Sequence, residues 1–284
     1  MENSPISASI ARVETLPTLP AVLARILSTA ADPGASALDL ARHISADPAL
    51  TATLLRIVNS AFYGFKRRID KITEAIVILG FTEVRNLALA ATAFGSLPET
   101  SSAYDRTQLW RHSIAAAIAA DRCAKTTGIA NPDTCFVAGL LHDIGKVVFD
   151  VLDPENCRRA ALHAHSRRMR IAEAERQLFQ YDHTGVGAAL GRHWNLPAPI
   201  TQAIQHHHAA ETRADLPETA KLTAVANALA YSADLGEASS GVPPAFPAGT
   251  AQALGISEEQ HHALENELRN AAPRIEGFIG AIHE

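Results

Sequence analysis

The chain has 284 residues, of which 47% are hydrophobic and 19% charged, and this composition is that of a soluble globular protein rather than a disordered one. No apolar stretch reaches the ~20 residues that cross a bilayer, and residues 1–16 lack the features of a secretory signal, so we expect a cytoplasmic protein without a membrane partner. A formal net charge of −5, together with three cysteines that form no Cys-x-x-Cys pair, argues against nucleic-acid binding, a disulfide framework and a thiolate zinc site.

The first hundred residues carry the periodicity and the capping signals of a helical bundle. Apolar residues recur at helical spacing over residues 19–27, after two prolines that fix the entry of the helix. Further helix ends are marked by a capping box (Ser36 with Asp39), an N-cap before a proline (Asp47-Pro48), a stop (Gly80) and a further N-cap (Thr82). We therefore predict an N-terminal helical subdomain over residues 1–100.

A polar stretch from Pro98 to Arg106 separates this bundle from a second helical region, for which we predict a subdomain over residues 101–284 that ends in a helix. Within it, Asn131-Pro132 begins a helix whose apolar residues form one stripe as far as Val148, and we expect Gly145 to end the regular helix soon after. We find no convincing strand and no solenoid repeat. The predicted fold class is therefore all-α, with the N-terminal bundle packed on the second helical subdomain.

The adjacent His142 and Asp143 are the most informative feature, because an imidazole beside a carboxylate suits a divalent metal. Asp143 lies at the edge of the apolar stripe and His142 ~100° further round, so both can face a groove between helices. The other candidate ligands are histidines expected on or beside further helices: His112, His183, and His207 and His208 in a run that begins at His206. Fe, Mn, Zn or Ni would suit this set, polarising a phosphoryl oxygen and activating bound water, while Lys146 could meet a phosphate.

The same residues can also be interpreted as structural residues rather than as metal ligands. A single histidine is more often a surface residue or a hydrogen-bonded core residue than a metal ligand. An unpaired aspartate beside an apolar stripe is costly, so we expect Asp143 to face either a cation or several hydrogen-bond donors. A metal site and a hydrogen-bonded network both satisfy that requirement.

The motifs along the chain resemble those of the HD phosphohydrolase superfamily and, within it, the HDOD domain, the HD-related output domain of bacterial signalling proteins. His112, His142-Asp143 and Asn227 occupy positions like the His, His-Asp and Asp of the superfamily, and His183 and His207-His208 resemble its extra ligands. The supporting segments are Leu16-Pro17-Thr18-Leu19-Pro20, Asp47-Pro48-Ala49-Leu50, Leu54 to Gly64, Ala75 to Gly80, and Trp194-Asn195-Leu196-Pro197. The resemblance covers residues 16–230 and implies that residues 101–284 form an HD-like helical subdomain.

Two departures from the superfamily pattern bear on function. Asn227 stands where the superfamily has a metal-binding aspartate, and an amide neither offsets a cation's charge nor acts as a base. No Gly-Tyr-Pro motif follows His208, unlike in the related cyclic-dinucleotide phosphodiesterases. The HDOD resemblance itself implies a regulatory domain that receives or relays a signal through protein contacts.

We therefore predict a non-catalytic or weakly catalytic signalling module that acts on a signalling protein in trans, compatible with a homodimer and with a bound divalent metal. The alternative is a metal-dependent phosphohydrolase or phosphodiesterase of a nucleotide or cyclic dinucleotide, in which Asp143 and Lys146 would be catalytic.

Three weaker signals leave alternatives open. Lys66-Arg67-Arg68 could contact phosphate or an acidic partner, or form a solvated loop. The proline-rich residues 242–247 either dock a partner or connect two helices. Gly185 and Gly187 lack the preceding strand and the third glycine of a dinucleotide site, so we interpret them as positions of close helix packing.

Overall fold

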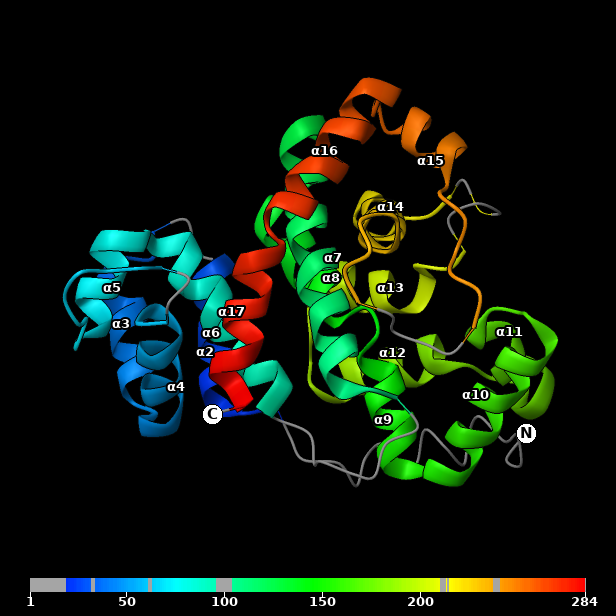
Figure 1. The fold of residues 1–284 in the computed structure, drawn as a ribbon, viewed down its shortest axis with the longest axis horizontal. Coiled ribbons are helices and arrows are strands. Elements are labelled where there is room, and N and C mark those ends of the chain that lie inside the picture. Colours follow the sequence, from blue (N-terminus) through cyan, green and yellow to red (C-terminus); the bar gives the residue numbers. More distant parts are fainter. Residues whose placement is uncertain are drawn as a thin grey trace. The chain divides into compact units, whose positions relative to one another are not determined.

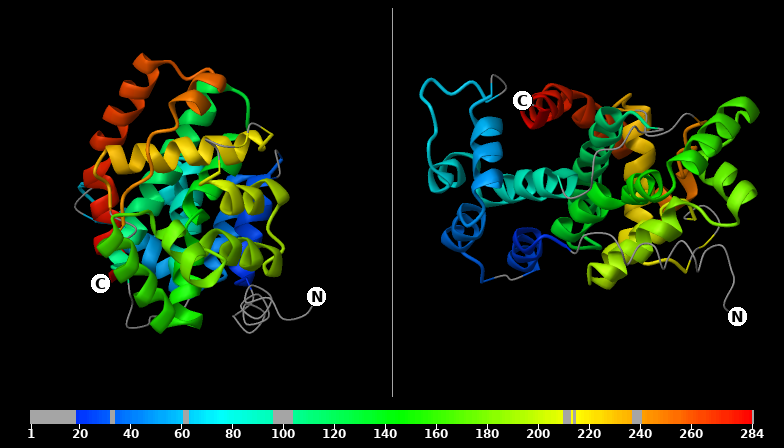
Figure 2. Two further views of the ribbon diagram at one scale, coloured as in Figure 1. Left: turned by 90° about the vertical axis from the view of Figure 1, so that its right-hand side faces the viewer. Right: turned by 90° about the horizontal axis from the view of Figure 1, so that it is seen from below.

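The computed structural model describes residues 19–31, 34–60, 63–95, 104–209, 213, 215–236 and 241–283. Within these ranges every regular element is a helix, which confirms the all-α class (Figures 1 and 2). None of the described helices combines the length and the apolar character needed to cross a bilayer. The contacts divide the chain into two compact units: the N-terminal unit, formed by Leu19–Ser96 with Ala271–Glu284, and the central unit, which contains Leu97–Asn270.

The N-terminal unit is a bundle in which each helix buries an apolar face. Its helices are α2 (Ala21–Ala31), α3 (Ala37–Ser45), α4 (Pro48–Val58), α5 (Ile72–Leu79), α6 (Phe81–Gly95) and α17 (Ala272–His283). The predicted capping box is confirmed, since the side chains of Ser36 and Asp39 each accept a hydrogen bond from the other's backbone N–H. The cap expected at Thr82 is wrong. Gly80, with φ of 91°, ends α5, and α6 begins directly after it, so Thr82 lies inside the first turn.

The last helix, α17, belongs to this N-terminal unit, although we predicted it with residues 101–284. Arg56 on α4 donates a hydrogen bond of 2.8 Å to the carbonyl oxygen of Ala281, and the rings of Phe94 and Phe278 meet edge to face at 6.4 Å. The apolar face of α17 needs a partner, and the bundle supplies one. An amphipathic pattern alone does not reveal which partner a helix takes.

The central unit is built around closely packed helices with small side chains. Its helices are α7 (Arg106–Thr127), α8 (Pro132–Leu141), α9 (Ile144–Leu152), α10 (Pro154–Arg167), α11 (Ile171–Phe179), α12 (His183–His193), α13 (Ala198–His206), α14 (Glu218–Ser232), α15 (Ala248–Ala253) and α16 (Glu258–Asn270). Helix α14, seen end-on in Figure 1 and lengthwise in Figure 2, contacts α7 and α8. A Cβ atom at Gly139 would lie 2.6 Å from the carbonyl oxygen of Ala116, so glycine permits the spacing of α7 and α8.

Candidate metal centre

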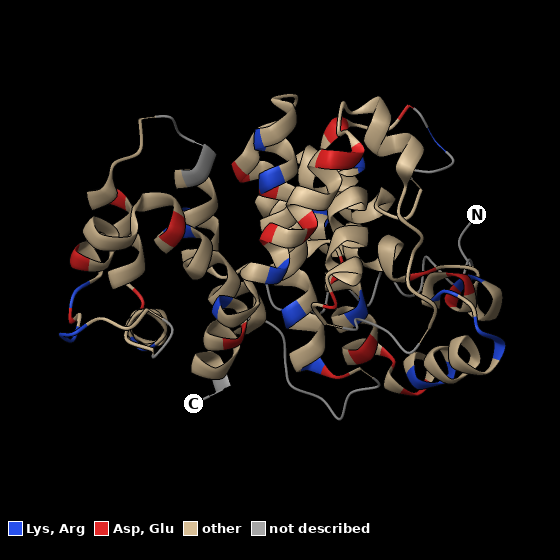
Figure 3. Cartoon of the chain, turned by 45° about the horizontal axis from the view of Figure 1, so that its top comes forward, with Lys and Arg blue, Asp and Glu red and all other residues tan. Residues whose placement is uncertain are grey.

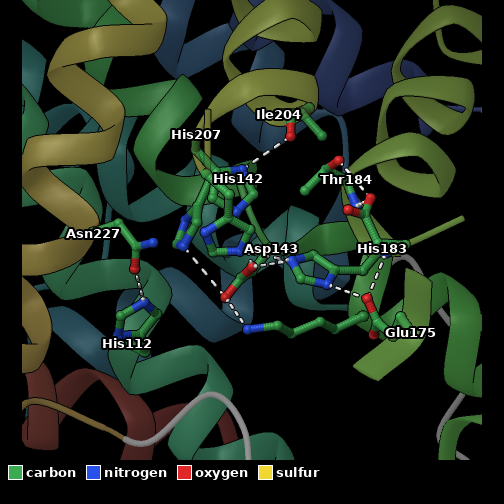
Figure 4. A network of polar contacts seen from close by, with 12 residues as sticks. His112, His142, Asp143, Glu175, His183, Thr184, Ile204, His207 and Asn227 are labelled. Atoms are coloured by element: carbon green, nitrogen blue, oxygen red, sulfur yellow. Dashed lines mark hydrogen bonds and ion pairs between the residues drawn. The ribbon is translucent and has the colours of Figure 1, made fainter. Parts of the chain in front are cut away.

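The structure brings all six predicted ligands together inside the central unit (Figure 4). His112 comes from α7, His142 and Asp143 from the junction of α8 and α9, His183 from the start of α12, and His207 and His208 from the turn after α13. They form two groups that share Asp143: one with His183, His207 and His208, the other with His112 and His142. Within each group, one ligand atom per residue lies within 4.8 Å of the others. His206 belongs to neither group.

A break between two helices places His142 and Asp143 in the site. The single helix predicted from Asn131-Pro132 to Val148 is wrong, because α8 ends before His142 and α9 starts after Asp143. Asp143 has φ of −100° and ψ of 10°, outside the helical region, whereas His142 keeps helical angles. Both side chains point into the site (Figure 4). The break interrupts the periodicity for only two residues, too briefly for the sequence pattern to reveal it.

We predicted that Gly145 ends the helix, but it lies inside α9, at the point where α9 meets α12. A Cβ atom there would overlap the carbonyl oxygen of His183 and lie 2.7 Å from the amide nitrogen of Gly187. A Cβ atom at Gly187 would in turn lie 2.8 Å from the Ile204 side chain, so the close helix packing predicted for that glycine is confirmed. The two glycines hold His183 next to Asp143.

Gly145→Ala is expected to destabilise the protein by about 1–3 kcal/mol, because the added methyl group pushes α9 away from α12. The same shift separates Asp143 from His183, so metal uptake falls as well. Thermal unfolding and metal content measure both effects. Gly249→Ala is the matched control, since a Cβ atom there meets nothing within 4 Å. Equal melting temperatures for the two variants would contradict the packing role.

Backbone carbonyls fix the rings of His142 and His207 in an orientation that suits metal binding. Nδ1 of His142 donates to the carbonyl oxygen of Gly139 at 2.7 Å, and Nδ1 of His207 donates to that of Ile204 at 2.9 Å. Each Nε2 atom is therefore a bare acceptor. Both are buried without a hydrogen-bond partner among the described residues, 3.3 and 3.5 Å from the oxygens of Asp143. Lone pairs that face inward, on rings held in place by backbone carbonyls, fit a divalent cation.

Asp143 is surrounded by positive charge. Its Oδ2 lies 2.6 Å from Nζ of Lys146, and its Oδ1 lies 3.3 Å from Nε2 of His183. Burial would raise the pKa of Asp143, but the neighbouring His142 and Lys146 hold it well below its usual range. Burial would lower the pKa of Lys146, but Asp143 raises it above its ordinary value. The carboxylate and the ammonium group are thus both charged, and each stabilises the other.

Glu175 on α11 orients His183 from the opposite side. Its Oε2 accepts hydrogen bonds from the backbone nitrogen of His183 at 2.8 Å and from Nδ1 of the ring at 2.7 Å. Burial would lower the pKa of His183, but Glu175 and Asp143 raise it to about 9. In the metal-free protein the His183 ring therefore carries a proton that a cation must displace.

The free energy of unfolding of the metal-free protein is expected to fall between pH 6.5 and pH 9. The folded pKa of His183 is raised from 6.5 to about 9, so its contribution is complete below pH 6.5 and is lost as the pH rises through 9. The upper limit of that loss is about 3 kcal/mol. Urea unfolding at a series of pH values, with a chelator present, measures it. Glu175→Gln should flatten the curve, and an unchanged slope in that variant would contradict the assignment.

His112, His207 and His208 are neutral. Burial and the neighbouring His142 lower the pKa of His112 to about 3, and burial lowers that of His207 to about 4. Nε2 of His112 donates a 2.9 Å hydrogen bond to Oδ1 of Asn227, which is the only polarity that suits an amide oxygen. Burial and His207 hold the pKa of His208 well below its usual value, and its Nε2 lies 3.2 Å from that of His183. The group around His112 therefore has one ligand nitrogen engaged by a neutral side chain.

One side of the site is covered by a further segment. Among the described residues, a pocket of about 20 Å³ lies beside His207, His208 and Asn227. The proline-rich residues 241–247, called the strap below, close this space with Pro244, Ala245 and Pro247. The strap is anchored at its start, where Val242 N donates to the carbonyl oxygen of Met169 at 3.1 Å. At its other end the ring of Phe246 stacks on that of His261 at 3.9 Å.

Sequence reasoning missed Glu175 and the strap as parts of this site. Glu175 is 0% exposed and eight residues before His183, a separation that matches no motif. The only available signal was an acidic residue on the buried side of an amphipathic helix. The strap was recognised as proline-rich, but its position over the histidines depends on the tertiary fold.

Three solved structures are similar to this chain. An HDOD domain protein with unknown function from Geobacter sulfurreducens is 26% identical, with a TM-score of 0.78 over 99% of this chain and 96% of that one. A candidate signal transduction protein from Marinobacter aquaeolei VT8 is 22% identical, with a TM-score of 0.83 over 99% of this chain and 65% of that one. A candidate phosphohydrolase from Shewanella amazonensis SB2B is 24% identical, with a TM-score of 0.76 over 97% of this chain and 98% of that one. The last two likenesses show the fold alone.

A protein described only as uncharacterized, from Treponema pallidum (strain Nichols), is 32% identical over an alignment of 212 residues, and the match covers 73% of this chain and 40% of that protein. This chain thus spans less than half the length of that relative. The family model for the HDOD domain matches residues 16–210, within the range over which the resemblance is carried by motifs. On the match to that model and the helical architecture, this chain belongs to the HDOD domain family.

Proposed function

We propose that this protein is a non-catalytic signalling module that acts through contacts with a protein partner in trans, and that its histidine pocket holds a divalent cation as a structural element. The closure of the pocket carries this proposal. A free volume of about 20 Å³ accommodates roughly one water molecule. A ligand pocket normally measures about 300–1,000 Å³, so the pocket between the strap and these histidines has no room for a nucleotide while the strap is in place.

The ligand chemistry supports the same conclusion. The group of Asp143 with His183, His207 and His208 offers one anionic oxygen and three imidazoles, a donor set that fits a divalent transition metal. Lys146 already engages the other oxygen of Asp143, on the side of His142 and His112. Asn227 adds no negative charge there. We therefore assign the cation to the group around His183.

A cation in that group would supply binding energy that links three helices. Asp143 precedes α9, His183 opens α12, and His207 follows α13. Because these elements lie far apart in the sequence, ligation would stabilise the folded central unit. The name of the Marinobacter structure, a signal transduction protein, agrees with such a role.

A phosphohydrolase is the second candidate function, because the six candidate ligands and Lys146 lie together as a metal-dependent hydrolase would require. The Shewanella structure is named as a phosphohydrolase candidate. The two functions differ in whether a phosphoester can reach the cation and be cleaved.

Turnover of purified, metal-loaded protein on a panel of nucleotide monophosphates and cyclic dinucleotides separates them. The proposal predicts one bound cation per chain, lost in Asp143→Ala, and no multiple-turnover hydrolysis by either protein. Hydrolysis by the wild-type protein that Asp143→Ala abolishes would overturn it. Asp215→Ala, which changes an exposed acid, is the control for a general effect of removing a carboxylate.

A further inference from the structure

A broad groove in the N-terminal unit is separate in residues and in chemistry from the histidine pocket. Its volume is about 1230 Å³, larger than the pockets of about 300–1,000 Å³ that hold small molecules. It runs between α4 and α17 and is bounded by residues 65–68, which lie between α4 and α5. A space of this size, with two helices as walls, suits a segment of polypeptide.

The lining of the groove is basic, although the chain as a whole carries a formal charge of −5. Four of its residues are cationic and none is acidic: Arg56, Lys66, Arg67 and Arg68. The side chains of Arg67 and Arg68 are 74% and 83% exposed, and they pair with Glu74 and Asp70 outside the groove. Because both arginine side chains are exposed to solvent, these pairs are weak, and an acidic ligand can compete for the arginines. Figure 3 shows Lys and Arg in the loop that leads into α5.

The lining of the same groove also includes an apolar part, which is partly bare backbone. It consists of Leu55 and Phe65 together with Gly277 and Gly280 of α17, and is called the floor. A Cβ atom at Gly280 would meet nothing within 4 Å, so the backbone of α17 is open to a close neighbour. A basic rim around an apolar floor is complementary to an amphipathic helix with acidic flanks.

The groove is already formed without a ligand. The side chain of Asn59 clamps the basic loop by two hydrogen bonds of 2.8 Å, one to the carbonyl oxygen and one from the amide of Ile69. Tyr63 and Phe65 stack with their rings 6.0 Å apart. Arg56 ties α17 to α4 through the carbonyl oxygen of Ala281. A preformed site loses little conformational entropy when a partner binds.

We propose that this groove binds an acidic amphipathic helix of a protein partner. The apolar floor favours such a helix over a nucleic acid, whose backbone offers no apolar face to Leu55 and the α17 glycines. This proposal rests on the proposed signalling role and names the partner's chemistry. Of the roles that the sequence suggests for Lys66-Arg67-Arg68, the proposal assigns contact with an acidic partner.

The test uses two fluorescent helical peptides of about 14 residues with the same leucine face, one with glutamates and the other with lysines on both flanks. Fluorescence anisotropy with the full chain should detect binding of the acidic peptide that weakens as salt is added, and none of the basic one. Lys66→Glu with Arg67→Glu should weaken binding by at least about tenfold, and Gly280→Leu should do so by filling the floor. Arg42→Glu, an exposed charge reversal on α3 of the same unit, is the matched control and should leave affinity unchanged.

Equal binding of both peptides, or an equal loss of affinity in Arg42→Glu, would overturn the proposal. So would tight binding of a single-stranded oligonucleotide without binding of the acidic peptide, or self-association of the chain that Gly280→Leu abolishes. Circular dichroism confirms that each variant is folded. Phosphoester turnover is measured on the same preparations. Turnover would refute the signalling role, whereas the absence of peptide binding without turnover would refute only the groove proposal.

Discussion

Asp143→Asn is expected to destabilise the metal-free protein by about 3–5 kcal/mol, because it leaves the ammonium group of Lys146 buried without its counter-ion. Asp143 is 1% exposed and lies 2.6 Å from Lys146, so water cannot replace the lost charge. The asparagine also removes the anionic ligand shared by both groups of candidate ligands, and metal binding is lost with it. Urea unfolding in the presence of a chelator measures the stability, and metal analysis measures the binding.

A second substitution tests whether the buried charge causes this loss. Asp143→Asn combined with Lys146→Met removes both members of the pair and should recover much of the stability, without restoring metal binding. Asp215→Asn breaks an exposed pair with Arg213 and should change stability little. A double variant no more stable than Asp143→Asn alone would contradict the role of Lys146 as counter-ion.

Asn227→Asp is expected to raise the affinity for a divalent cation by at least about tenfold, because it supplies a second carboxylate to a site rich in neutral imidazoles. Oδ1 of Asn227 lies 2.9 Å from Nε2 of His112, and Asn227 lines the same small pocket as His207 and His208. The new negative charge therefore also attracts a cation held by the group around His183. Competition against a metal indicator measures the change. Asn270→Asp, at the exposed end of α16, is the control and should leave the affinity unchanged.

The same variant separates the two barriers to hydrolysis. Asn227→Asp by itself should remain without turnover, because the strap still covers the pocket. Substituting Pro244 and Pro247 by glycine in that background loosens the strap and is expected to admit small phosphoesters. If Asn227→Asp alone hydrolyses phosphodiesters rapidly, the closed pocket is not the barrier that we infer.

The predictable parts of the fold were those encoded by neighbouring residues. The capping box of Ser36 and the N-cap of Asp47 depend on side chains within three residues of the backbone groups they bind, and both are present. The start of α8 at Asn131-Pro132 is present for the same reason. The destination of α17 was not predictable, because its apolar face is satisfied by any suitable surface and the choice is made by tertiary packing.

The ligands of the candidate site were predictable from the sequence, but the groups that position these ligands were not. The order and type of the histidines around His142-Asp143 indicated the six residues that the structure gathers. Glu175 was missed because a buried acid that orients a histidine has no fixed spacing from it. The break before α9 was missed because the apolar residues on either side keep helical spacing. Both omissions concern groups that act through tertiary contacts.

The absorption spectrum of the cobalt-loaded protein tests the central claim most directly, because it reports on the ligands of the cation and on access to them. We expect one cobalt ion per chain, a spectrum abolished by Asp143→Asn, and no change when inorganic phosphate is added, since the strap closes the pocket. A spectrum that shifts with phosphate in the wild-type protein would contradict the account, because a phosphoryl oxygen would then reach the cation as it does in a hydrolase.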